Sequence, residues 1–152
     1  MNNIKTWVEG EVKAAEYLKK IGYKIIDKNC KICGSEIDIV AILSKKEQKI
    51  LLINEFKSRK FEDKKQELFH KNSLKREIKS LKDKLVFVEV KFRSSKKFGA
   101  PYESVGKQKQ HNLVRGVLAY NAKFNIKNLP IRIDVISIVD DQIEHITNAF
   151  DV

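Results

Sequence analysis

Apolar and polar positions repeat with two different periods along the chain, and the changes of period divide it into helices and strands. After a capping-box pattern at residues 6–9, apolar residues recur at helical spacing until Gly22, which predicts a helix over residues 7–21. Helical spacing returns over residues 62–83 and 104–124. Apolar runs and alternation of period two predict strands over residues 23–26, 36–42, 49–56, 85–92, 131–139 and 143–150.

The segment at about 44–84 interrupts an otherwise regular succession of elements. Without it the order is α-β-β-β-α-β-β, which predicts an α/β fold with a central mixed sheet flanked by helices. A length of 152 residues with 42% hydrophobic content suits one domain over 1–152. The segment holds 14 Lys and Arg against 7 Asp and Glu, so it carries +7 of the net +11. It is either an arm that binds nucleic acid or a solvated excursion without a partner.

The positive charge directs attention to polyanions. A net charge of +11 and a pI of about 9.6 make nucleic acid the first partner to consider. The alternative is a lysine-rich surface that is simply solvated. No stretch has the length and apolar character of a signal peptide or a membrane span, so we expect a cytoplasmic protein without a membrane partner.

The two cysteines, Cys30 and Cys33, do not complete a recognisable site. A zinc site would need a second Cys pair or two well-placed histidines, and the sequence offers neither at a suitable spacing. A redox pair of the thioredoxin type would open a helix, whereas this pair falls between two expected strands.

Two predicted strands carry acidic side chains that could converge. Residues two apart share a face of a strand, so Glu89 and Lys91 point to one side of theirs, and Glu36 and Asp38 to one side of another. If these strands are neighbours, Asp38 and Glu89 meet, and their repulsion is relieved by a proton or by a cation. Carboxylate oxygens with room for water favour Mg²⁺ or Mn²⁺.

Such a site predicts phosphodiester hydrolysis. A divalent ion lowers the pKa of a bound water and neutralises charge on the phosphodiester, while Lys91 orients that water or stabilises the developing charge. The simpler interpretation is that Glu89 and Lys91 form a surface ion pair on an edge strand.

A second Glu-x-Lys sequence, Glu55-Phe56-Lys57, competes for the same role. It also ends an apolar run, and its distance from Asp38 in the sequence suits a single hairpin better. The strand that contains Glu89, however, has an unbroken core face made by Val86, Val88, Val90 and Phe92. We therefore expect Glu89 on a central strand beside Asp38, and Glu55 near an edge of the sheet.

Several sequence blocks recur in the order found in a known family. They are Gly10-Glu11-x-x-Ala14, Gly34-x-Glu36-Ile37-Asp38, Val86-Phe87-Val88-Glu89-Val90-Lys91-x-Arg93, Phe98-Gly99-x-Pro101, Pro130-x-Arg132-x-Asp134 and Ile143-x-His145-Ile146-x-Asn148. In these blocks the chain resembles the YraN-like family of bacterial proteins, which is grouped with the PD-(D/E)xK nuclease-like superfamily. The resemblance covers nearly the whole chain outside the segment at about 44–84.

The resemblance implies a restriction-endonuclease-like core, similar to that of Holliday-junction resolvases, with a divalent-metal site. Asp38, Glu89 and the Val90 carbonyl would be metal ligands, Lys91 would orient water, and Glu11 would be an added acidic group. The departures are Ser35, where the family usually has a second glycine, and the insertion. The implied function is a Mg²⁺- or Mn²⁺-dependent nuclease acting on DNA, with branched or flapped structures among the candidate substrates. The alternative is a nucleic-acid-binding module that keeps the fold without turnover.

Further basic residues complete the predicted DNA-binding surface. We expect contacts to phosphates from Arg93, Lys96, Lys97, Lys107 and Lys109. An enzyme that cuts a junction would need two sites related by a two-fold axis, so a homodimer is a candidate assembly. Arg132 and Asp134 are predicted to form a structural ion pair, and the three histidines are predicted to be non-catalytic.

Overall fold

The computed structural model describes the backbone of residues 2–93 and 105–152, and the side chains of residues 8–92 and 105–152. Its elements are α1 (Asn2–Lys20), β1 (Tyr23–Ile32), β2 (Ser35–Leu43), α2 (Lys45–Ser58), α3 (Lys64–Ser80), β3 (Lys84–Arg93), α4 (Lys107–Lys123), β4 (Ile131–Val139) and β5 (Gln142–Phe150). No helix in the described residues is both long and apolar enough to cross a membrane.

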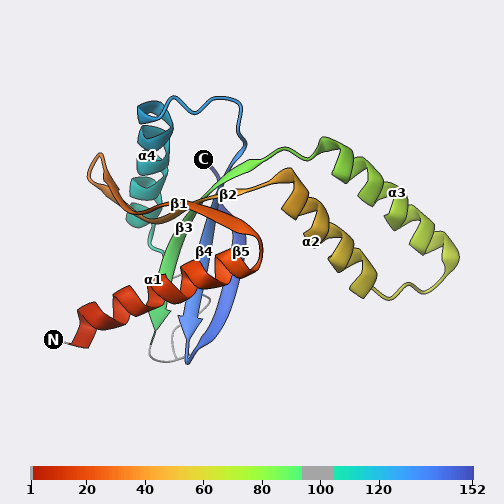
Figure 1. Cartoon of the computed structure of the whole chain (residues 1–152), viewed down its shortest axis with the longest axis horizontal. Helices are drawn as coiled ribbons and strands as arrows, with labels where there is room; N and C mark the ends of the chain where they lie inside the picture. Colours follow the sequence, from red (N-terminus) through yellow and green to blue (C-terminus); the bar gives the residue numbers. More distant parts are fainter. Residues whose placement is uncertain (1, 94–104) are drawn as a thin grey trace.

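The five strands form one mixed sheet in the order β1-β2-β3-β4-β5 (Figure 1). Neighbouring strands are antiparallel except β3 and β4, which are parallel and are connected through α4. This is the predicted α-β-β-β-α-β-β order, and it is consistent with a restriction-endonuclease-like core. The central position of β3 agrees with its sequence, because Val86, Val88 and Val90 are buried on one face and Leu85 and Phe87 on the other.

Helices α1 and α4 cover opposite faces of the sheet and divide the core into two layers (Figure 1). Under α1, Ala14 and Leu18 pack against the even-numbered residues of β3. Under α4, Leu113 and Val117 pack against Leu85 and other odd-numbered residues. Alternation along β3 therefore builds both layers, as expected for a strand buried on both sides.

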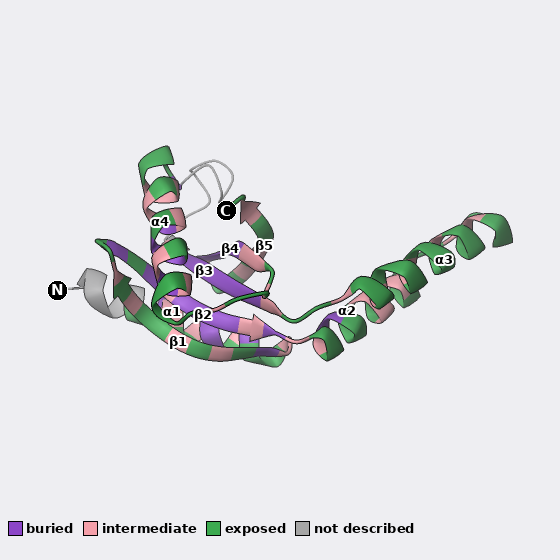
Figure 2. Ribbon diagram, turned by 90° about the horizontal axis from the view of Figure 1, so that it is seen from above, coloured by how far each residue is buried: buried purple, intermediate pink, exposed green. Residues whose placement is uncertain are grey.

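Helices α2 and α3 form an arm, residues 44–83, that leaves the sheet between β2 and β3. Leu43 and Lys84 pair directly across these two strands, so the arm occupies the place of a hairpin turn. Figures 1 and 2 show it extending away from the sheet, with mostly exposed or half-buried residues. At its base the buried Gln48 side chain donates hydrogen bonds to the carbonyls of Leu43 and Lys82, which joins the two connections to the sheet.

The strand predicted over residues 49–56 is wrong, because this segment lies within α2. Ser44 caps the helix by accepting a hydrogen bond from the backbone N–H of Glu47. Since β2 and β3 pair with each other, the sheet offers no place for a strand between them. Glu55 consequently lies on a helix of the arm and not near a sheet edge.

Smaller differences concern the ends of elements. Helix α1 begins at Asn2, so Thr6 lies inside the helix and not at its N-cap. Strand β1 continues to Ile32 instead of ending at residue 26, and the turn falls at Cys33 and Gly34, both with positive φ. Helix α4 begins at Lys107, after the N-cap Gly106, and so later than predicted. Periodicity leaves such boundaries open by one or more residues.

A buried ionic cluster joins β4 to β5 beneath α1. The fully buried carboxylate of Asp134 accepts hydrogen bonds of 2.8 and 2.7 Å from the Arg132 side chain and of 3.0 Å from the Asn148 backbone N–H. The His145 Nε2 atom lies 2.8 Å from Asp134 Oδ2, and Arg132 also donates to the Tyr23 hydroxyl. Arg132 and Asp134 thus form the predicted structural pair. Burial favours the protonated acid, but the donors outweigh it and lower the pKa of Asp134.

We predict that Asp134→Ala lowers the free energy of unfolding by about 3–5 kcal/mol, because Arg132 would be left without its counter-charge in a buried setting. Urea denaturation at pH 7 measures this loss. Since folding lowers the pKa of Asp134, its stabilisation is present above the unfolded pKa of about 4 and is lost as the pH falls through the folded value. The exposed Asp151→Ala is the control, and equal losses in the two variants would contradict the prediction.

Candidate active site

The predicted acidic residues meet where β2 lies beside β3. Ile39 pairs with Val88, which places Asp38 next to Glu89 across two antiparallel strands. Glu89 lies on the opposite face of β3 from Val88 and Val90, which pack in the layer under α1. The prediction that Asp38 and Glu89 lie close together required their strands to be neighbours, and β2 and β3 are neighbours.

The backbone of β3 holds the Asp38 carboxylate in place. The Val90 N–H donates a hydrogen bond of 2.7 Å to Asp38 Oδ2. Burial and the nearby charge of Glu89 raise the pKa of Asp38 to about 7, although the Val90 hydrogen bond and Lys109 act in the opposite direction. The charge of Glu11 on α1 contributes to the increase and is the smallest of these causes. Asp38 is thus a carboxyl group poised to gain or lose a proton near neutral pH.

Glu89 is almost completely buried and lies between two ammonium groups. Lys91 Nζ is 2.8 Å from Glu89 Oε1, and Lys109 Nζ is 3.1 Å from Glu89 Oε2. Only 2% of the Glu89 side chain is exposed, against 19% for Lys91 and 38% for Lys109. The Oε2 atom accepts no hydrogen bond of good geometry from any described residue. This buried oxygen therefore retains unused capacity for a ligand.

Small residues bring the two helices close to these strands. A Cβ atom at Gly10 would lie 3.1 Å from the Phe92 ring, so α1 approaches the end of β3 closely next to Glu11. A Cβ atom at Gly116 would lie 2.9 Å from that of Ser35, which brings α4 onto β2. The Ser35 hydroxyl donates a hydrogen bond to the Asn112 carbonyl of α4. Ser35, where the family usually has a glycine, therefore contacts α4 through its side chain.

The regular alternation predicted for β2 is not fully kept around Asp38. The sequence predicts Ile37 and Ile39 on one face, but Ile37 packs in the layer under α4 and Ile39 in the layer under α1. The register between β1 and β2 passes over Asn29 and Asp38, and Asn29 has a φ of 52°. The irregularity lies at the candidate catalytic residue, where backbone strain is commonly found.

The predicted phosphate-binding residues have different outcomes. Lys96 and Lys97 lie outside the described residues. Arg93 is the last residue of β3, and only its backbone is described. Lys107 is exposed at the start of α4, as a phosphate contact would require. Lys109 instead pairs with Glu89 and so belongs to the acidic cluster. No local pattern predicts this contact, because it depends on how α4 packs against β3.

The donor atoms at the site determine which metal ion it could bind. No three His, Cys, Asp or Glu side chains in the described part of the chain are grouped so as to hold a metal. The available donors are Asp38, Glu89 with its unsatisfied Oε2, and the Val90 carbonyl. Few protein donors, all of them oxygen, fit Mg²⁺ or Mn²⁺, which keep several water or phosphate ligands. They would not suit a structural zinc ion, which is normally enclosed by four protein ligands.

Comparison with known proteins places this site in a family context. The model of "Uncharacterised protein family UPF0102" matches residues 10–82 and 68–138. The chain belongs to this family. Glu11 and Asp38 fall in the first matched range of this UPF0102 protein, and Glu89, Lys91 and Lys109 fall in the second. The two ranges overlap over residues 68–82, which begin in α3 and end just after it.

Relatives match this UPF0102 protein along almost its whole length. A UPF0102 protein of Clostridioides difficile (strain 630) is 33% identical over 152 residues, which cover 99% of this chain and 100% of the relative. One of Thermodesulfovibrio yellowstonii is 35% identical over 150 residues and 99% of each chain. One of Persephonella marina is 32% identical over 149 residues and 96% of each chain. The YraN-like resemblance read from the sequence blocks is thereby confirmed.

We predict that Asp38→Asn stabilises the metal-free protein at pH 8. Asparagine can still accept the Val90 hydrogen bond, but it removes a buried charge beside Glu89. The gain in free energy of unfolding should be on the order of 1–4 kcal/mol. Folding raises the pKa of Asp38, so the wild type loses stability as the pH rises from about 4 to 7. Denaturation in EDTA should therefore show the gain shrinking as the pH falls from 8 to 4, and a gain independent of pH would contradict this cause.

We also predict that Lys109→Met strengthens Mn²⁺ binding about fivefold, which corresponds to about 1 kcal/mol. The substitution removes the ammonium group next to Glu89 Oε2 and keeps an unbranched side chain of similar length. Isothermal titration calorimetry gives the dissociation constants. Lys107→Met, which removes an exposed charge from the same helical turn, should change the affinity little. Equal effects of the two variants, or weaker binding by Lys109→Met, would show that Lys109 does not compete with the ion.

Proposed function

We propose that this protein is a metal-dependent nuclease that hydrolyses phosphodiester bonds in DNA, with branched or flapped structures as candidate substrates. One observation carries the proposal: Asp38 and the buried Glu89 lie side by side on neighbouring strands, with the Lys91 ammonium 2.8 Å from Glu89. Two adjacent carboxylates in a buried site are destabilising without a cation or a proton. Such an arrangement is more readily explained by a ligand than by stability.

Each side chain has a separate task in this proposal. Asp38, held by the Val90 N–H, and Glu89 would bind the divalent ion together with the Val90 carbonyl. The ion supplies a bound water of lowered pKa and positive charge opposite the phosphate. Lys91, fixed by Glu89, orients the attacking water or stabilises the negative charge that develops on the phosphate.

Glu11 and Lys109 complete the charge balance around these residues. The negative charge of Glu11 reaches Asp38 and would strengthen the attraction for a cation. Lys109 neutralises Glu89 in the metal-free protein, and its ammonium is exposed enough to turn towards a phosphate when an ion occupies Glu89. In this proposal the ion would replace the Lys109 ammonium as the positive charge next to Glu89.

The charge of the chain supports a nucleic acid as substrate. A net charge of +11 attracts polyanions and raises the rate at which they associate. Two of the predicted phosphate contacts, Lys107 and Lys109, lie in the first turn of α4, next to the acidic cluster. Cleavage of a junction would further require a homodimer, so that two sites face opposing strands.

A non-catalytic nucleic-acid-binding module is the second candidate. It is favoured by the two ammonium groups on Glu89, which already satisfy its charge without an ion. The two candidates differ in turnover, so a cleavage assay separates them.

We predict that the protein cleaves DNA only with Mg²⁺ or Mn²⁺, and that Glu89→Ala and Lys91→Ala each reduce the rate about 100-fold or more. The assay is a panel of single-stranded, duplex, flap and four-way-junction DNA, with EDTA as the blank. Glu55→Ala is the matched control, since it alters the other Glu-x-Lys sequence, which lies in the arm. Loss of activity in Glu55→Ala with retention in Glu89→Ala would sink this assignment. Binding without cleavage of any substrate would favour the second candidate.

A further inference from the structure

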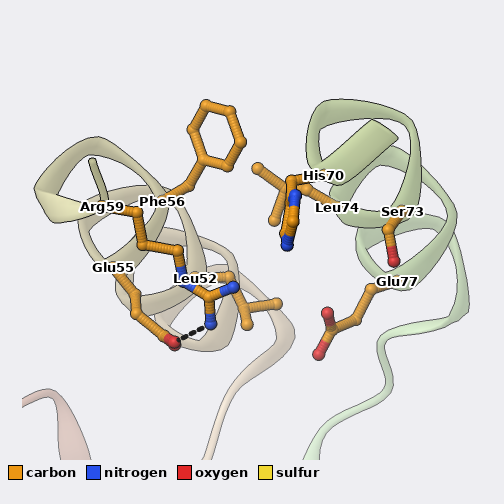
Figure 3. A pocket seen from close by; sticks show the side chains of 8 residues that line it. All are labelled: Leu52, Glu55, Phe56, Arg59, His70, Ser73, Leu74 and Glu77. Atoms are coloured by element: carbon orange, nitrogen blue, oxygen red, sulfur yellow. Dashed lines mark hydrogen bonds and ion pairs between the residues drawn. The ribbon is translucent and has the colours of Figure 1, made fainter. Parts of the chain in front are cut away.

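Helix α3 has two sides of very different character. The side towards α2 contributes His70, Ser73, Leu74 and Glu77 to a pocket of about 240 Å³ between the two helices. Figure 3 shows these side chains across the pocket from Leu52, Glu55 and Phe56 of α2 and from Arg59, which directly follows α2. No residue of α3, all of which is described, is fully buried. The helix therefore packs on one side only and leaves the other to solvent.

The outward side of α3 carries positive charge and no negative charge. At 100° per residue, six cations and no carboxylate fall on this half of the helix. The two acidic residues of α3, Glu67 and Glu77, fall on the other half, and Figure 3 shows Glu77 on the side of the pocket. The outward face of α3 is defined by Lys64, Lys65, Leu68, Phe69, Lys71, Asn72, Lys75, Arg76 and Lys79.

None of the six cations on this face forms an ion pair with any residue in the described part of the chain. The same face carries Leu68 and Phe69, which are 58% and 66% exposed and rank above the other exposed large hydrophobic residues described. Leaving such side chains in water has an unfavourable free energy that contact with a ligand would remove. An exposed aromatic ring among unpaired cations is typical of surfaces that contact nucleic acids.

We propose that the outward face of α3 binds the phosphate backbone of a nucleic acid, with Phe69 packing against an exposed base or sugar. The proposal rests on the proposed function only for the class of ligand, and it assigns the arm a binding role separate from the acidic cluster. A second copy of the chain fits this face less well, because pairing two such faces would bring twelve positive charges together without a carboxylate between them.

The position of the arm makes it a remote anchor. Glu89 lies five residues along β3 from Lys84, where the arm rejoins the sheet, which is about 17 Å at the rise of a strand. Helix α3, with 17 residues, adds about 25 Å of binding surface beyond that point. The arm therefore contacts nucleic acid away from the bond to be hydrolysed, and a long substrate gains more from it than a short one.

Two charge-matched variants test the proposal in the full-length protein. The first replaces Lys71, Lys75, Arg76 and Lys79 by Gln, and the second replaces the exposed Lys19, Lys20, Lys24 and Lys28 of the body by Gln. Fluorescence anisotropy in EDTA measures binding to a labelled single strand and a labelled duplex across a salt series. The slope of log affinity against log salt is negative, and the arm variant should make it less steep by about 2–4, at 0.7–0.9 per lost phosphate contact. The body variant should change the steepness of this slope much less.

A third variant, Phe69→Ser, tests the aromatic contact. It should weaken binding of the single strand about 5- to 100-fold while leaving the salt slope unchanged, because stacking adds affinity without releasing counterions. Circular dichroism confirms that each variant is folded, and exposed Lys→Gln changes have little effect on helix propensity.

Defined results would overturn the proposal. Equal slopes for the arm and body variants would mean that the arm acts only through net charge. A concentration-dependent oligomer that Phe69→Ser abolishes would identify the face as a self-association surface instead. The proposed function fails separately, because it is judged by cleavage with Mg²⁺ or Mn²⁺, whereas the arm is judged by binding in EDTA.

Discussion

The burial of Glu89 beside Asp38 is the constraint around which the structure is organised. A carboxylate with only 2% exposure on a central strand requires positive charge, and Lys91 and Lys109 supply it from β3 and α4. A second carboxyl group next to it then has its pKa raised to about 7 by burial and by the charge of Glu89. The protein thus maintains at this point an arrangement that does not favour stability and that a divalent cation would relieve.

Close packing and buried hydrogen bonds hold the sheet and its helices together around these residues. Gly10 and Gly116 allow α1 and α4 to approach the sheet closely on its two faces. The Asp134 cluster joins β4 to β5 with several charge-assisted hydrogen bonds, all directed at one buried carboxylate. The buried Asp134 and the partly buried Asp38 therefore differ: donors stabilise the charge of Asp134 and lower its pKa, whereas the pKa of Asp38 is raised. The contrast separates a structural carboxylate from a candidate catalytic one.

The arm adds charge without altering the sheet. Because Leu43 and Lys84 remain paired across its base, the 40 residues of 44–83 could be inserted at a hairpin turn while the register of Asp38 and Glu89 is preserved. The arm carries +6 of the net +11 and lies beyond the end of the strand that bears Glu89.

The sequence by itself determined the strands with strong alternation and the faces of β3. Val86, Val88 and Val90 pack on one side and Glu89 lies on the other, because a period of two leaves no alternative once both faces of a strand are covered. It also determined the family, through blocks that extend over most of the chain.

Only the tertiary structure decided where these elements meet. Residues 49–56 have an apolar pattern that suits a strand, yet they form part of helix α2 in the arm, outside the sheet in which β2 and β3 pair with each other. The contact of Lys109 with Glu89 was likewise hidden, since it depends on how α4 docks and not on any spacing along the chain. Local patterns fix which side of an element is apolar, whereas the partner of a side chain is fixed by packing between elements that are distant in sequence.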